Sequence, residues 1–80
     1  MREQVYERLN KVFREMFDDD TITLNDKTTA KDVDGWDSLT YMSLIMEIES
    51  EFDMKFSVKD IISMQSVGEM VDIIMEQAHL

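Results

Sequence analysis

The chain has 80 residues, enough for one small domain over residues 1–80, which would bury only about 60% of its unfolded surface and have modest stability. Its 18 acidic and 8 basic residues give a formal net charge of −10, which argues against nucleic acid as a partner and favours partners with basic patches. No cysteine is present, which excludes a disulfide framework and a thiolate metal site, and no apolar run is long enough for a membrane span.

Residues 1–17 are predicted to form the first helix, because apolar side chains recur there at helical spacing. The positions that carry this pattern are Val5, Leu9, Val12, Phe13 and Met16. Residues 18–36 then lose all periodicity and begin with three consecutive aspartates. A connection of this length is usually functional or disordered, and its composition allows a short helical turn near residues 28–33.

Residues 38–53 carry the strongest helical periodicity in the chain. One apolar stripe on this helix is predicted to face the core, and it consists of Tyr41, Leu44, Ile45, Ile48 and Phe52. A second stripe, Leu39, Met42 and Met46, is displaced by about a third of a turn and exceeds what one core face needs. The helix is therefore either buried on two sides or presents an apolar strip to a partner.

Two further helix starts follow. Ser57–Asp60 resembles a capping box with aspartate in its last position, and it predicts a helix of one to two turns through Ile62. Ser66–Glu69 matches the capping box itself and opens a last helix, whose apolar positions are Val67, Met70, Val71, Ile74 and Met75. Three longer helices and one short helix predict an all-α fold, a small four-helix bundle.

Candidate catalytic and metal-binding groups are sparse or wrongly spaced. A Ser–His–Asp arrangement would have to use His79, the only histidine, close to a C-terminus that is expected to fray. The acidic residues after Asp32 fail the calcium-loop pattern, because Trp36 and Asp37 occupy its fifth and sixth positions. We therefore predict a protein that is not an enzyme and that has no dedicated metal site.

Ser38 follows the tripeptide Gly-Trp-Asp and stands where the second long helix begins. Its ordinary role would be that of an N-cap, with a hydroxyl that accepts a backbone N–H and contributes about 1 kcal/mol. A helix N-terminus also tolerates a phosphate, because its dipole and free N–H groups favour negative charge. Residues 32–54 contain seven acidic residues and no lysine or arginine, so the serine is predicted to lie beside an acidic docking surface.

The sequence Asp37-Ser38-Leu39, followed by a helix that ends in Glu49-Ser50-Glu51-Phe52, resembles the acyl carrier protein family. The resemblance covers essentially the whole chain, because the order of the helices, the length and the acidity also agree. In that family the serine carries 4′-phosphopantetheine through a phosphodiester, and the thiol of this arm holds acyl groups as thioesters. The resemblance implies a phosphoprotein with the arm on Ser38, with Leu39 in the motif and with Asp37 assisting the metal-dependent step of the transferase.

The same resemblance implies a set of partners. A phosphopantetheinyl transferase would attach the arm from coenzyme A, and acyl-loading and acyl-processing enzymes with basic patches would dock on the second helix. Matched by position, the contact residues would be Leu39, Met42, Met46, Glu47 and Glu49. For the two methionines the alternative is ordinary core filling. The core stripe of this helix could line a cavity that takes an acyl chain.

Several positions depart from housekeeping carriers of fatty acid synthesis. Thr40 and Ser43 stand where those carriers usually have Asp and Glu, and Trp36 stands where a small residue is common. Gly-Trp-Asp-Ser-Leu is more similar to carriers of polyketide, nonribosomal peptide or other specialised pathways. We predict an acyl carrier of fatty acid, polyketide or related biosynthesis. An aminoacyl or peptidyl carrier is the alternative for the cargo, and an acidic helical adaptor with Ser38 only an N-cap is the alternative of another class.

Localisation and oligomeric state follow from weaker signals. The residues after Met1 are charged and amphipathic and contain no apolar leader, so we expect a cytoplasmic protein. Nothing in the sequence predicts an oligomer, and a monomer is the default expectation.

Overall fold

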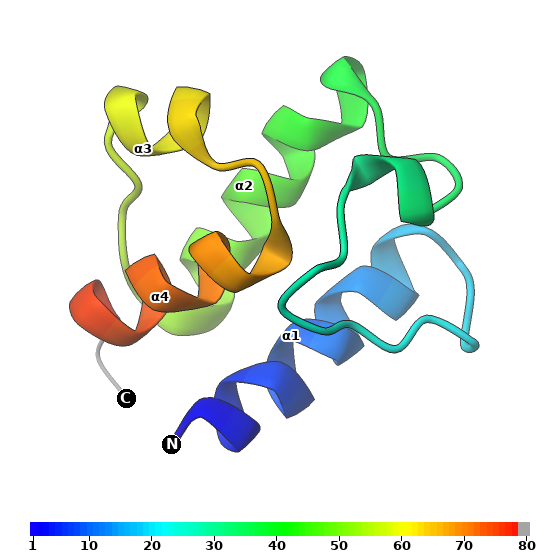
Figure 1. Cartoon of the computed structure of the whole chain (residues 1–80), viewed down its shortest axis with the longest axis horizontal. Helices are drawn as coiled ribbons and strands as arrows, with labels where there is room; N and C mark the ends of the chain where they lie inside the picture. Colours follow the sequence, from blue (N-terminus) through cyan, green and yellow to red (C-terminus); the bar gives the residue numbers. More distant parts are fainter. Residues whose placement is uncertain (79–80) are drawn as a thin grey trace.

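The computed structural model describes residues 1–78 and consists of four helices joined by loops (Figure 1). In chain order the four α-helices are α1 (Arg2–Met16), α2 (Ser38–Phe52), α3 (Val58–Ser63) and α4 (Val67–Gln77), and a 3₁₀ turn, η1 (Ala30–Asp32), lies between α1 and α2. Residues 1–78 contain no strand. The predicted all-α fold with three longer helices and one short helix is confirmed. His79, and with it the catalytic alternative, lies outside the described residues.

The core is built from the apolar faces of α1, α2 and α4, closed by residues of the connecting loops. Its largest fully buried side chains are Phe13, Phe52, Leu9, Leu44, Ile45, Ile48, Met70, Ile74, Val5, Val67 and Val71. Each such side chain contributes about 1.5–3 kcal/mol through its removal from water. The predicted stripes on α1 and α2 thus supply the core, with Met16 and Tyr41 packed half-buried at its margin.

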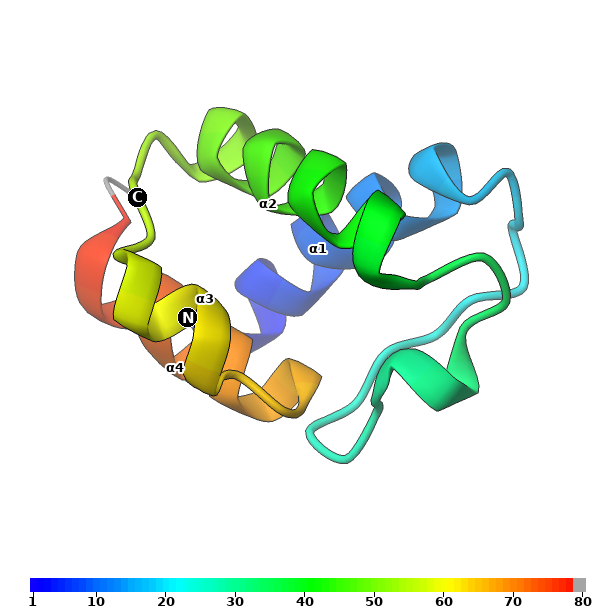
Figure 2. The same cartoon turned by 90° about the horizontal axis from the view of Figure 1, so that it is seen from above.

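Both views place the long loop between α1 and α2 at one end of the molecule and the end of α4 at the other (Figures 1 and 2). Side chains of α1 hold the first part of this loop. Arg14 donates from Nε to the carbonyl of Ile22 at 2.6 Å, and the side-chain oxygen of Asn10 accepts the N–H of Leu24 at 2.8 Å. The short helical turn allowed near residues 28–33 is present as η1, which Thr29 caps.

The loop also docks against the first turn of α4 through backbone hydrogen bonds. The N–H of Val67 donates to the carbonyl of Thr28 at 2.8 Å, and the N–H of Gly68 donates to the carbonyl of Asp26 at 3.1 Å. The Ser66 hydroxyl accepts the backbone N–H of Glu69 at 3.3 Å. The first-turn donors of α4 are therefore satisfied partly by its own cap and partly by the loop.

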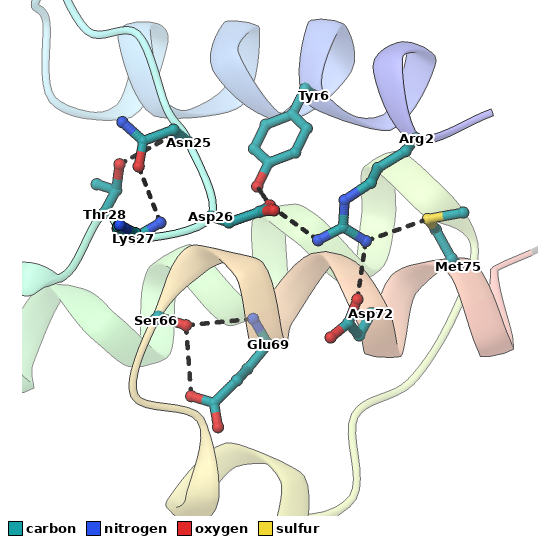
Figure 3. A network of polar contacts seen from close by, with 10 residues as sticks. All are labelled: Arg2, Tyr6, Asn25, Asp26, Lys27, Thr28, Ser66, Glu69, Asp72 and Met75. Carbon is teal, nitrogen blue, oxygen red and sulfur yellow. Dashed lines mark hydrogen bonds and ion pairs between the residues drawn. The ribbon is translucent and has the colours of Figure 1, made fainter.

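Arg2 adds an ionic connection between the same parts of the chain. Its guanidinium lies 2.8 Å from the carboxylate of Asp26 in the loop and 2.8 Å from that of Asp72 on α4 (Figure 3). The Tyr6 hydroxyl donates to the same Asp26 carboxylate. The hydrogen bond from Tyr6 and then that from Arg2 hold the pKa of Asp26 below its usual value, while burial and this contact raise the pKa of Tyr6 to about 12.

The loop contact makes Gly68 a sensitive position. A Cβ at this residue would lie 2.7 Å from the carbonyl oxygen of Asp26, so a larger residue must push the loop away. We expect Gly68→Ala to destabilise the fold by about 1–3 kcal/mol, measured by urea unfolding. Helix propensity alone works in the opposite direction, because alanine is favoured over glycine within helices. An unchanged or increased stability would contradict the close packing of the loop on α4.

The Asp26 contacts should make stability depend on pH. Because folding lowers the pKa of Asp26, its contribution is present above the ordinary value of 3.8 and is lost as the pH falls through the lowered value. We expect Asp26→Asn to be less stable than the parent at neutral pH, with a difference that shrinks below pH about 4 in urea titrations. Asp20→Asn, at an exposed loop aspartate, is the control. A pH-independent difference would contradict an ionic contribution.

Candidate functional site

The start of α2 is capped by Asp37 and not by Ser38. The Asp37 carboxylate accepts the backbone N–H of Leu39 at 2.9 Å and that of Thr40 at 3.0 Å. In return the Thr40 hydroxyl accepts the N–H of Asp37 at 2.8 Å, which completes a capping box. The interpretation of Ser38 as the N-cap is therefore wrong, because the preceding aspartate satisfies the N–H groups that a serine cap would take.

Ser38 is the first residue of α2, and its side chain is exposed. Since the cap is supplied by Asp37, the serine hydroxyl has no capping role. The same capping hydrogen bonds, first that from Thr40, hold the pKa of Asp37 below its ordinary value. The residue next to the serine is therefore a carboxylate at neutral pH.

The turn before this site depends on Gly35, the first residue of the Gly-Trp-Asp-Ser-Leu sequence. Its φ of +92° lies in the left-handed region, which residues with a Cβ rarely adopt. The Gly35 carbonyl also accepts the hydroxyl proton of Thr40 at 2.8 Å. Thr40, which stands where housekeeping carriers have Asp, thus ties the turn to the first turn of the helix.

The second apolar stripe of α2 lies in solvent. The exposed fractions are 84% for Leu39, 52% for Met42 and 67% for Met46. The alternative of core filling for the two methionines is therefore wrong, because the core takes the other face of the helix, with Leu44, Ile45 and Ile48. An exposed apolar strip of this kind is typical of an interaction surface.

The acidic residues predicted to surround this strip differ in exposure and in their hydrogen-bond and ion-pair partners. Glu47 is exposed, whereas Glu49 is half-buried and its carboxylate accepts the N–H of Phe56 at 2.9 Å. Glu51 is paired with Arg8 at 2.8 Å. Glu49 therefore holds the segment that follows α2 and Glu51 is tied to α1, whereas Glu47 lies exposed next to the strip.

A pocket of about 240 Å³ opens beside Ser38, and of the core stripe that was expected to line a cavity only Tyr41 lines it. It lies between the loop before α2, the first turns of α2, and the link from α3 to α4. Its lining includes Trp36, Ser38, Tyr41, Met64, Gln65 and Met70. The only signal in the sequence was the position of the single tryptophan two residues before the serine.

Within residues 1–78, no group of three or more His, Cys, Asp or Glu side chains is arranged to hold a metal ion. Over the same residues, every helix is too short or too polar to cross a membrane.

Comparison with known proteins assigns the chain to a family. A family model described as the phosphopantetheine attachment site matches residues 7–74. The acyl carrier proteins of Thermotoga maritima and Phenylobacterium zucineum are 29% and 34% identical to the chain over 73 residues. These alignments cover 91% of the chain and 90% and 92% of the relatives. The chain belongs to the acyl carrier protein family.

A solved structure supports the same assignment for the fold. The solution structure of a holo acyl carrier protein from Geobacter metallireducens matches with a TM-score of 0.85 and 36% identity. The match covers 91% of this chain and 84% of that one. The predictions of family, fold and a covalent phosphopantetheine are confirmed, and the protein is a carrier rather than an enzyme.

The cofactor fits the geometry at the start of α2. A phosphodiester on an exposed first-turn hydroxyl would lie at the positive end of the helix dipole, which favours it by about 0.3–1 kcal/mol. The pocket alongside has room for part of the arm. When bound, the arm supplies a thiol that forms thioesters, a group that this cysteine-free chain lacks.

The capping geometry leads to opposite expectations for two neighbouring residues. We expect Asp37→Ala to lower stability by about 0.5–2 kcal/mol, because two N–H groups lose their acceptor. Asp37→Asn, which retains capping ability, is the matched control. Ser38→Ala should change the urea midpoint little, since Ser38 is not the cap. An equal loss in the Ser38 and Asp37 variants would contradict this assignment.

Proposed function

We propose that Ser38 carries the phosphopantetheine arm and that the chain, as a single carrier domain, presents acyl thioesters to partner enzymes. The observation that carries this proposal is the exposed hydroxyl of Ser38 at the first position of α2, left available because Asp37 caps the helix. The family match over residues 7–74 includes this position.

The docking face is proposed to be the exposed strip of Leu39, Met42 and Met46 with Glu47 beside it. The apolar side chains would add adhesion, and the acidic residue would meet a basic patch on the transferase and on acyl-loading or acyl-processing enzymes. The net charge of −10 supports electrostatic steering of such partners toward the carrier.

The pathway is proposed to be a specialised one, such as polyketide synthesis, rather than housekeeping fatty acid synthesis. Support comes from Trp36, which lines the pocket beside the serine, and from Thr40, which takes part in the capping box. Both residues depart from the usual pattern, and both have a defined place in this structure. An aminoacyl or peptidyl cargo stays the alternative, because the same thiol chemistry would serve it.

Intact mass tests the attachment residue directly. After incubation with coenzyme A, magnesium and a broad-specificity phosphopantetheinyl transferase, we expect the mass to increase by one phosphopantetheine. Ser38→Ala should show no increase. Ser43→Ala, at another exposed serine of α2, should be modified like the parent. Modification of the Ser38 variant, or failure of the parent with several transferases, would overturn the proposal.

The docking face can be tested by reversing single charges. We expect Glu47→Lys to lower kcat/KM of the transferase by about fivefold at low salt, with a smaller effect at high salt. Glu7→Lys, the same change at an exposed position of α1, should have little effect. Equal losses in the two variants would mean that only net charge matters and that α2 is not the docking face.

A further inference from the structure

The pocket beside Ser38 has a rigid apolar wall. Trp36 packs edge-on against Phe13 with ring centroids 5.3 Å apart, and its centroid lies 6.4 Å from that of Tyr41. The Tyr41 hydroxyl donates to the carbonyl of Ile61 at 2.7 Å, which ties α2 to α3. The aromatic wall is therefore held by Phe13 of α1 on one side and by the tie between α2 and α3 on the other.

The pocket combines this wall with a polar margin. Met64 and Met70 complete the apolar lining, and Gln65 and Ser66 contribute polar side chains. Its volume of about 240 Å³ is below the roughly 300–1,000 Å³ of pockets that enclose whole drug-sized ligands. The space therefore suits a small group with an apolar centre and polar atoms on either side.

The phosphopantetheine arm has such a group next to its phosphate. One methylene after the phosphate comes a carbon that bears two methyl groups, and a hydroxyl and an amide follow it. On Ser38 this segment cannot diffuse away from the pocket that the serine itself lines. Tethering over such a short span gives an effective concentration of order mM, so even weak contacts would be occupied.

We propose that this pocket binds the proximal, dimethyl-bearing segment of the arm, with Trp36 as its apolar wall. The inference rests on the proposed function, because it requires the arm to be attached at Ser38. Leu39, Met42 and Met46 are not among the pocket residues. An arm bound in this pocket would therefore run from Ser38 toward α3 and α4. The apolar strip of α2 would stay uncovered for a partner.

The single tryptophan provides the readout. We expect attachment of the arm, verified by intact mass, to lower acrylamide quenching of Trp36 by about twofold, because the segment would cover the exposed part of the ring. The indole N–H resonance of Trp36 should shift as well. Arms loaded from coenzyme A, butyryl-coenzyme A and dodecanoyl-coenzyme A should give the same protection, since the proximal segment is common to all three.

Two methionine variants complete the test. Met64→Ala removes part of the pocket wall and retains Trp36 as the fluorophore. In this variant, acrylamide quenching of Trp36 should therefore be the same with and without the arm. Met46→Ala, at an exposed methionine outside the pocket, should keep the protection. Melting temperatures of both variants establish that they fold.

The outcomes separate this inference from the proposed function. A mass increase at Ser38 without protection of Trp36 would overturn the docking of the arm and leave the carrier function intact. Protection that appears only with one acyl chain length would show that the cargo, and not the arm, occupies the pocket. Absence of any mass increase at Ser38 would overturn both proposals.

Discussion

The capping of α2 by Asp37 is the interaction on which the functional end of this protein depends. A helix of this length begins with several N–H groups that need acceptors, and Asp37 and Thr40 satisfy them reciprocally. Because the cap is one residue earlier than the serine, Ser38 enters the helix with an exposed side chain. The same arrangement leaves a positive helix end beside a hydroxyl, which is a suitable place for a phosphodiester.

A second set of contacts holds the long loop that forms one side of this site. Backbone carbonyls of Asp26 and Thr28 accept N–H groups from the start of α4, and Arg2 connects the loop to α4 by ion pairs. These contacts are far from Ser38 in sequence, yet the loop carries Trp36 to the pocket and α4 carries Met70 to it. The pocket beside the serine therefore depends on packing across the whole chain.

The large negative charge destabilises the fold and, in the proposed function, steers partners toward the carrier. Repulsion among 18 acidic residues destabilises a domain of this size, and few of these carboxylates form an ion pair with a basic side chain within residues 1–78. Where relief occurs, as for Glu51 beside Arg8 and for Asp26 beside Arg2, the carboxylate helps to hold elements together. Glu47 stays exposed beside the apolar strip of α2, where the proposed basic partner would meet its charge.

The sequence by itself determined the four helices, because apolar periodicity and cap residues are local signals that this small core does not override. It also determined the family, since the Asp-Ser-Leu motif and the order of the helices are properties of the chain. Only the tertiary structure decided that Asp37 caps α2, that Met42 and Met46 face solvent, and that Glu49 holds Phe56. It also decided that Trp36 and Met70 share a pocket with Ser38. Each of these features depends on which face of a helix the neighbouring segments cover and on contacts between distant segments. The local spacing of residues in the sequence determines neither the covered face nor those contacts.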